Sequence, residues 1–235
     1  MGIPKYHRVL LKLSGEALAG KDGILDFSFL DQIAKQIHRC TAEGVQVAVL
    51  VGAGNIWRGR QGTGMDRTRA DHMGMLATVI NALALQDAFL REGIPAKTFT
   101  SVEIESFADP FTVRDAIAAL ESGTVAVLGG GLGVPFLSTD TAAAIRAAEI
   151  GADCILMAKN IDAIYSDDPK KNPEAVRYTD LTYKQILDEG LRALDLTATI
   201  FCMDNHICGY AFGLANPENI YRVVMGEAVG TEIHN

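Results

Sequence analysis

A lysine interrupts an apolar segment near the start of the chain, and a serine and a glycine follow it closely in Lys12-Leu13-Ser14-Gly15. Residues 9–13 predict a buried strand, where a charged side chain is costly unless an anion pairs with it. Ligands of open α/β sheets bind at the carboxyl ends of the strands, which is where Lys12 lies. The pattern favours a phosphate contact, and the alternative is a lysine that reaches solvent from the sheet edge.

Glycine-rich loops follow two further predicted strands, Gly52-Ala53-Gly54-Asn55 and Gly129-Gly130-Gly131-Leu132-Gly133. Glycines at strand ends let backbone N–H groups approach an anion closely, and a helix N-terminus adds its positive dipole. One such loop is usually an ordinary turn, but three at separate strand ends predict a phosphate-binding edge. The chain contains neither G-x-x-x-x-G-K-[ST] nor a G-x-G-x-x-G run after a strand, so we expect ATP to bind without a Walker loop.

Acidic side chains lie at the starts of two predicted helices. Ser138-Thr139-Asp140 opens an alanine-rich helix, and Asp195 opens another. Each segment has the residue types of a helix cap and could be only that. Together, Asp140 and Asp195 supply two carboxylates near the glycine loops, able to hold Mg²⁺ or to orient Lys12.

Positive charge is concentrated in one place. The formal net charge of −8 argues against a general nucleic-acid or anionic-membrane surface, since either needs a basic field. Arg58, Arg60, Arg67 and Arg69 nevertheless fall within a dozen residues that also hold three glycines. This cluster predicts a site for an anionic ligand, with a solvated basic loop as the alternative. Residues 162–169 combine an aromatic side chain with several acids, which suits a base and ribose hydroxyls as well as a surface turn.

Strands and helices are expected to alternate along the chain. The predicted strands are residues 9–13, 45–51, 96–100, 124–128, 154–158, 210–212 and 227–233. The predicted helices are residues 29–43, 71–91, 112–121, 139–150, 182–188, 195–205 and 216–225, with Ser28 as N-cap of the first. This order predicts an α/β fold, a three-layer α/β/α sandwich with a mainly parallel sheet. The helix at 71–91 is apolar on nearly every face, so it should be buried or lie at a subunit contact.

Length and composition fit a single domain over residues 1–235. With 49% hydrophobic residues the chain can bury a large core, and the turn-rich segment 167–173 should divide two lobes, about 1–150 and 151–235. The longest apolar runs, such as 45–51, are shorter than the ~20 residues that cross a bilayer, and residues 1–12 lack a signal-peptide pattern. We therefore expect a cytoplasmic protein with reduced core thiols at Cys40, Cys154, Cys202 and Cys208.

Taken together, the motifs resemble the bacterial UMP kinase (uridylate kinase) branch of the amino acid kinase family over about residues 6–231. The segments that carry the resemblance are Arg8-Val-Leu-Leu-Lys-Leu-Ser-Gly-Glu-Ala-Leu18, Gly54-Asn-Ile-Trp-Arg-Gly59, Asp71-His-Met-Gly-Met-Leu-Ala-Thr-Val-Ile-Asn-Ala-Leu-Ala-Leu-Gln-Asp87, Ser138-Thr-Asp140 and Arg222-Val-Val-Met-Gly226. The resemblance implies Mg²⁺-dependent transfer of the ATP γ-phosphoryl group to UMP, giving UDP and ADP, in de novo pyrimidine nucleotide biosynthesis. It also implies a homohexamer with paired long helices, and no membrane or nucleic-acid partner is expected.

Site residues follow from the resemblance position by position. Catalysis is expected from Lys12, Arg58, Asp140 and Asp195, with Mg²⁺ carried mainly by the ATP phosphates near Asp195. ATP binding is expected from Lys12, Leu13, Ser14, Gly15, Gly54, Arg58, Asn160, Tyr165 and Asp168. UMP binding is expected from Ala53, Asp71, Leu132, Gly133, Val134, Pro135, Phe136, Leu137, Ser138 and Thr139.

The chain departs from the family pattern in its glycine loops. The family reads Gly-Thr-Gly-Asn-Pro where this chain has Gly131-Leu132-Gly133-Val134-Pro135, so apolar side chains replace two polar ones that face the acceptor. The family's triple glycine is Gly52-Ala53-Gly54 here, and the loop at 20–25 is shorter than the one associated with GTP activation. Two other functions stay open: a kinase of the same fold with a carboxylate or carbamate acceptor, and a nucleotide- or anion-binding assembly without turnover.

Overall fold

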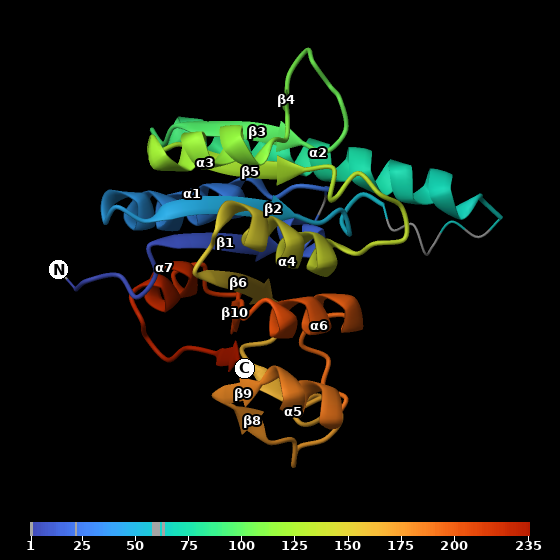
Figure 1. Cartoon of the computed structure of the whole chain (residues 1–235), viewed down its shortest axis with the longest axis vertical. Coiled ribbons are helices and arrows are strands. Elements are labelled where there is room, and N and C mark those ends of the chain that lie inside the picture. The colour runs from blue at the N-terminus through green and yellow to red at the C-terminus, as the bar shows by residue number, and fades with distance from the viewer. Residues whose placement is uncertain (1, 22, 58–61, 63) are drawn as a thin grey trace.

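Within the described residues, 2–21, 23–57, 62 and 64–235, the computed structural model contains a nine-stranded sheet between two layers of helices (Figure 1). The strands are β1 (Arg8–Leu13), β2 (Gln46–Val51), β3 (Ala96–Thr100), β4 (Asp109–Pro110), β5 (Val125–Gly129), β6 (Cys154–Lys159), β9 (Asp180–Thr182), β10 (Cys208–Gly213) and β11 (Thr231–His234), with β7 (Ile164–Tyr165) and β8 (Arg177–Tyr178) in a separate hairpin. The α-helices are α1 (Phe27–Ala42), α2 (Arg67–Arg91), α3 (Val113–Glu121), α4 (Thr139–Ile150), α5 (Tyr183–Asp188), α6 (Leu196–Asp204) and α7 (Asn219–Val224).

The order of the strands places β1 at a reversal of the sheet. The order is β4-β3-β5-β2-β1-β6-β10-β11-β9, and every neighbouring pair is parallel except β10 and β11. The chain leaves β5, forms α4, and re-enters the sheet as β6 on the other side of β1. Open α/β sheets bind ligands at such a reversal, beyond the carboxyl ends of the strands.

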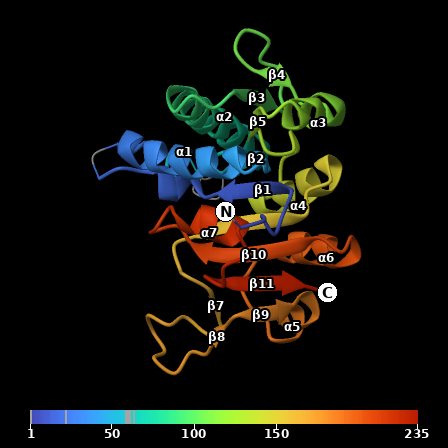
Figure 2. The same ribbon diagram turned by 90° about the vertical axis from the view of Figure 1, so that its left-hand side faces the viewer.

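The two faces of the sheet bury different side chains, because alternate residues of a strand point to opposite faces. Leu11 and Leu13 of β1 belong to the core that includes α1, α2 and α7. Leu10 belongs to the second core, which includes α3, α4, α5 and α6. Figure 2 shows these helix layers on the two sides of the sheet. The predicted three-layer sandwich with a mainly parallel sheet is confirmed.

Most long elements lie where the sequence predicts them, and the differences are at their ends. Helix α1 begins at Phe27 because the Asp26 carboxylate accepts a hydrogen bond from Phe29 N at 3.0 Å, so Ser28 is not its N-cap. Helix α2 begins at Arg67, four residues before the predicted start, because Asp66 caps it through Arg69 N at 3.1 Å. The short strands β4, β7, β8 and β9 have no counterpart in the prediction, since two or three residues are too few to show a period.

Helix α2 is longer and more exposed than a simple core helix. Among the described residues it is the one helix long and apolar enough to cross a bilayer by length and composition, and 44% of its most apolar window is buried inside the structure. Its C-terminal half contributes Ala82, Leu85 and Phe89 to the core. Met73, Leu76 and Ile80, spaced along one side of the helix, are exposed. Figure 1 shows the N-terminal half of α2 projecting past the strand ends.

Candidate functional site

A cavity of about 600 Å³ lies beyond the carboxyl ends of β1, β2 and β5, between the N-terminal halves of α2 and α4. Its lining residues that the sequence predicts as site residues are Lys12, Ser14, Gly15, Ala53, Gly54, Asp71, Leu132, Val134, Phe136, Leu137, Ser138, Thr139, Asp140 and Asp195. The cavity is also lined by Gly52, Trp57, Arg67, Gly74, Met75, Thr78, Gly130 and Gly131. Three separate strand ends therefore contribute to one site.

Lys12 enters the cavity from the central strand. Its neighbours Leu11 and Leu13 point into the α1–α2 core, so Lys12 points to the α4 face. There its Nζ lies 2.9 Å from Oδ1 of Asp140, in the first turn of α4, with 18% and 23% of the two side chains exposed. The lysine does not pass to open solvent. A charged side chain is tolerated in this strand because the Asp140 carboxylate pairs with it, and the largely buried Lys12 side chain lines the cavity.

Asp195 joins the N-termini of two helices. Its carboxylate caps α6 by accepting from Ala198 N at 2.8 Å, and it also accepts from Thr141 Oγ1 at 3.1 Å and from Ser138 Oγ. Ser138 Oγ is in turn the cap of α4, since it accepts from the backbone N of Asp140 at 3.0 Å and of Thr141 at 3.1 Å. This network fixes the position of Asp140 relative to Lys12.

The loops after β1 and β2 are packed against each other with no room for a side chain at Gly15. A Cβ added there would lie 2.6 Å from Gly52 O, from Gly54 N and from Asn55 Oδ1. The buried amide of Asn81, from α2, donates to Gly52 O at 2.8 Å and exchanges hydrogen bonds with the Asn55 amide at 2.8 and 2.9 Å. Asn81 thus holds the β2 loop against the start of the short 3₁₀ helix at Gly15–Leu18.

The glycine loop after β5 is held from two sides. Gly130 N donates to Thr78 Oγ1 of α2 at 2.7 Å. Ser101 Oγ donates to Gly131 O at 2.7 Å, and the buried Arg146 of α4 donates to Ser101 Oγ at 2.9 Å while its guanidinium stacks 3.7 Å from the Phe111 ring centre. Gly130, Gly131 and Gly133 all have positive φ, which glycine adopts without strain. The loop is therefore rigidly positioned before any ligand arrives.

Asp71 connects α2 to the segment at residues 132–139. Its Oδ2 accepts from Phe136 N at 2.9 Å, and Arg67 Nε donates to the same oxygen at 2.8 Å. Phe136 has a φ of 72°, uncommon for an aromatic residue, and its ring is exposed 5.5 Å from the Arg67 guanidinium. Asp71 thus holds a strained, open segment at the mouth of the cavity, where a ligand that binds Asp71 would also contact that segment.

Several predicted site residues lie outside the cavity. The side chain of Leu13 is buried in the core between sheet and helices, so this residue offers a ligand only its backbone. Asn160, Tyr165 and Asp168 do not line the cavity. They lie after β6 and around the β7–β8 hairpin, where Tyr165 Oη donates to Asp162 at 2.9 Å. Gly133 and Pro135 belong to the loop without lining the cavity. Arg58 and Arg60 lie outside the described residues.

A second lysine, Lys159, lies near Lys12 and is not among the residues that the sequence predicts for the site. Lys159 ends β6, the strand beside β1, and its Nζ donates to Ala193 O. Burial lowers the pKa of Lys159 below its ordinary value, Asp140 opposes that change, and the charge of Lys12 adds to it. The Asp140 carboxylate thus interacts with the positive charges of both Lys12 and Lys159. The available signal was a lysine at the end of an apolar strand, the same signal that marked Lys12.

Comparison with known proteins identifies the family that shares this architecture. The amino acid kinase family matches residues 7–209. The structure of a UMP kinase from Bacillus anthracis superimposes with a TM-score of 0.94 at 34% identity, covering 97% of this chain and 96% of that one. A UMP kinase from Ureaplasma parvum gives 0.93 at 34% identity over 98% and 100% of the two chains. A uridylate kinase from Archaeoglobus fulgidus gives 0.73 at 30% identity over 96% and 99%.

The chain belongs to the amino acid kinase family, and its sheet and helix layers have the fold of that family. The resemblance drawn from the sequence motifs is thereby confirmed.

The Asn81 contacts predict a specific loss of stability. We expect Asn81→Leu, which keeps a similar volume, to lower the free energy of unfolding by ~1–3 kcal/mol because the buried Gly52 carbonyl and the Asn55 amide lose their partner. The control is Asn205→Leu, whose exposed amide donates to Phe201 O and can be replaced by water. Urea unfolding measures both. Equal losses in the two variants would show that Asn81 does not hold the loop.

Proposed function

We propose that this protein is a UMP kinase that transfers the γ-phosphoryl group of ATP to UMP, giving UDP and ADP, in de novo pyrimidine nucleotide synthesis. The observation that carries the proposal is the Lys12–Asp140 pair, placed where three glycine-bearing strand ends open into one cavity. The 34% identity to two UMP kinases over nearly the whole chain supports the choice of acceptor within the family.

The geometry suits a transfer that needs no general base. The acceptor is a phosphate, whose second pKa of ~6 leaves it deprotonated near pH 7. Catalysis then consists of positioning two phosphate groups and neutralising their charge. In the proposal, Lys12 contacts the transferred group between the two substrates, and the backbone N–H groups of Gly15 and Gly54 face the phosphate oxygens. Asp140 orients Lys12, and Asp195 acts by fixing the α4 N-terminus that carries Asp140.

The two parts of the chain would bind different substrates. In the proposal, the lobe at about residues 1–150 holds UMP through Asp71, Ala53 and the segment 132–139. The lobe at about 151–235 holds the ATP nucleoside through Asn160, Tyr165 and Asp168, which lie beyond the cavity on the β6 side. Lys159, at the junction, would face the ATP phosphates. Arg58 is proposed to neutralise phosphate charge together with Lys12.

Magnesium fits this site as an ion that arrives on ATP. The described residues hold no group of three or more His, Cys, Asp or Glu side chains that could bind a metal by themselves. Mg²⁺ usually keeps several waters and binds through substrate phosphates and one or two carboxylates, and Asp140 and Asp195 both line the cavity. When bound, the ion would neutralise charge on the β- and γ-phosphates.

The exposed side of α2 supports an oligomer. Met73, Leu76 and Ile80 form an apolar stripe that a second copy of the same helix could cover, and we propose a homohexamer built on such helix pairs. We propose a cytoplasmic location, where ATP and UMP are both available.

The acceptor-facing loop is where base selectivity would depart from that of the family. Leu132 and the exposed Val134 replace two polar side chains of the family pattern, so fewer hydrogen-bonding groups face the base. A site that lacks hydrogen-bond partners for a polar group discriminates weakly by that group. Selectivity between UMP and CMP would then depend on backbone groups of residues 131–139.

The proposed activity is tested by measuring ADP release from Mg-ATP with UMP, dUMP, CMP, N-acetylglutamate or aspartate as the acceptor. We expect turnover with UMP well above that with either amino acid acceptor, because the cavity presents backbone donors and cations suited to a phosphate. A preference for N-acetylglutamate or aspartate would contradict the proposed acceptor while keeping the family. Tight ATP binding without turnover on any acceptor would favour an assembly that only binds nucleotides.

Replacing Lys12 tests its proposed role in catalysis. We expect Lys12→Met to lower kcat with UMP by about 100-fold or more, since removing one preorganised donor to a developing charge costs that much. Circular dichroism should show that Lys12→Met is folded. If the unpaired Asp140 carboxylate destabilises that variant, the double variant Lys12→Met with Asp140→Asn should fold, because it removes the unpaired charge. The control Lys184→Met, an exposed lysine on α5, should keep full activity. Near-normal kcat in folded Lys12→Met would remove Lys12 from the mechanism.

A further inference from the structure

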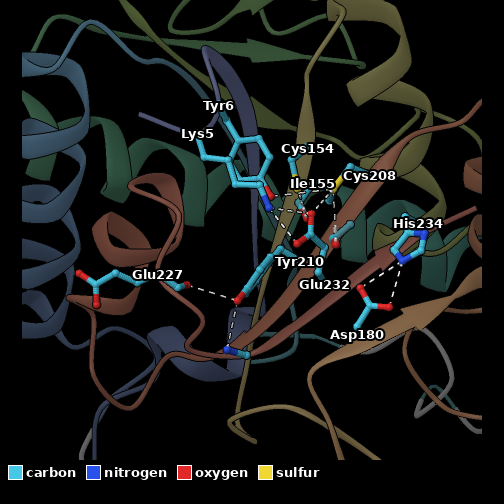
Figure 3. A network of polar contacts seen from close by, with 12 residues as sticks. Lys5, Tyr6, Cys154, Ile155, Asp180, Cys208, Tyr210, Glu227, Glu232 and His234 are labelled. Atoms are coloured by element: carbon cyan, nitrogen blue, oxygen red, sulfur yellow. Dashed lines mark hydrogen bonds and ion pairs between the residues drawn. The ribbon is translucent and has the colours of Figure 1, made fainter. Parts of the chain in front are cut away.

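Two cysteines face each other at the end of the sheet opposite the cavity. Cys154 begins β6 and Cys208 begins β10, and the register of these parallel strands makes the two residues direct partners. Directly paired residues of neighbouring strands point to the same face. Both thiols lie against the α1 and α7 side of the sheet, Cys154 within that core and Cys208 packed on it. Figure 3 shows the two side chains beside each other.

Their spacing permits a bond between them. Neighbouring strands stand ~4.8 Å apart, which lies inside the range of ~4.4–6.8 Å found between the Cα atoms of disulfides. Disulfides prefer Cβ atoms ~3.8 Å apart, so this pair would close with some strain. A strained disulfide is more easily reduced than a relaxed one. The pair is therefore suited to reversible closure and not to a permanent crosslink.

Polar and charged side chains lie close to Cys208. The Tyr6 hydroxyl lies 4.0 Å from its Sγ, and the Cys208 thiol donates a hydrogen bond to Glu232 Oε1 at 4.0 Å. Lys5 Nζ forms an ion pair with Glu232 at 2.8 Å (Figure 3). Cys208 is also partly exposed, whereas Cys40, Cys154 and Cys202 are buried. A reagent from solvent would reach Cys208 first.

The net effect of the groups around Cys208 is to lower its pKa and so to favour its ionisation. A hydrogen bond from the Cys154 thiol lowers the pKa of Cys208, as do a hydrogen bond from Tyr6 and the charge of Lys5, against opposing effects of burial and Glu232. Burial and this hydrogen bond raise the pKa of Cys154 well above its ordinary value, so Cys154 stays protonated as the donor. Burial likewise raises the pKa of Tyr6. The thiolate is the reactive form of cysteine.

We propose that Cys208 and Cys154 form an oxidisable dithiol that hydroperoxides close to an intrachain disulfide between β6 and β10. The Cys208 thiolate attacks a peroxide oxygen, the O–O bond breaks, hydroxide leaves and takes up a proton as water, and Cys208 becomes a sulfenic acid. The Cys154 sulfur then bonds to the Cys208 sulfur, the S–O bond breaks, and the leaving hydroxide carries away the Cys154 proton as water. Two thiols lose two electrons, and one molecule of hydrogen peroxide becomes two of water.

This site is independent of the proposed phosphoryl transfer. Cys154 and Cys208 start their strands, while the cavity lies beyond the carboxyl ends, and neither cysteine lines it. The dithiol can therefore be tested by its chemistry alone, whatever the acceptor of the enzyme proves to be.

The test is peptide mass spectrometry of the reduced, full-length protein after hydrogen peroxide treatment and blocking of remaining thiols with N-ethylmaleimide. We expect a Cys154–Cys208 linked peptide pair that dithiothreitol removes, with Cys40 and Cys202 still recovered as maleimide adducts. Cys154→Ser should stop the reaction at a Cys208 sulfenic acid that dimedone traps, and Cys208→Ser should abolish both products. The control Cys40→Ser, in helix α1, should leave the linked pair unchanged.

Several results would overturn the proposal. Failure to form the linked pair while the folded protein retains two free thiols at these positions would do so. A disulfide between Cys208 residues of two copies, or oxidation of Cys40 or Cys202 ahead of Cys208, would also contradict it. The wild-type experiment decides the point even if a serine variant fails to fold. The rate of iodoacetamide labelling in the native wild-type protein gives a second reading, and Cys208 should react first.

Discussion

A single charge in the central strand constrains the rest of the site. Lys12 lies in β1 with apolar neighbours on both sides, so its ammonium is tolerated only because Asp140 meets it at 2.9 Å. That contact requires the first turn of α4 to lie over the end of β1, although α4 follows β5 in the chain. Ser138 and Asp195 supply the hydrogen bonds that hold this turn in place. The ion pair between Lys12 and Asp140 thus constrains where α4, which connects β5 to β6, packs on the sheet.

The glycine loops around Lys12 depend on supports that lie behind them. Backbone N–H groups can face a phosphate only if the loops remain open without a ligand, and side chains from α2 and α4 keep them so. Asn81 holds the β2 loop, Thr78 holds Gly130, and Arg146 holds Ser101 and through it Gly131. These are buried or nearly buried polar groups with partners, which makes the loops rigid. Preorganisation of this kind is what a reaction based on positioning requires.

Sequence patterns predicted the features that local chemistry determines. The alternation of strands and helices, the glycine loops, and the caps at Ser138 and Asp195 were visible because each depends on residues close together in the chain. The role of Asn81 was not visible, since its partner Gly52 lies 29 residues away and an asparagine in a long apolar helix gives no sign of its contact. The predicted start of α2 is four residues late, because arginines and an aspartate at residues 66–69 indicate a loop as readily as a first helical turn.

Three residues that the resemblance assigns to ATP lie apart from the cavity. Asn160, Tyr165 and Asp168 follow β6 in the chain, and none of them lines the cavity. A nucleotide extended from Lys12 toward β7 would connect the two regions, with Lys159 between them. Contacts of this kind depend on the ligand itself, which no pattern in the chain encodes.

The most direct test of the central claim is a crystal structure of the protein with UMP, Mg²⁺ and the β,γ-imido analogue of ATP. We expect the UMP phosphate and the γ-phosphate analogue on either side of the Lys12 ammonium, with uracil against residues 132–139 and Asp71 in contact with UMP. UMP bound outside the cavity, or Lys12 still paired with Asp140 and in contact with neither phosphate, would contradict it.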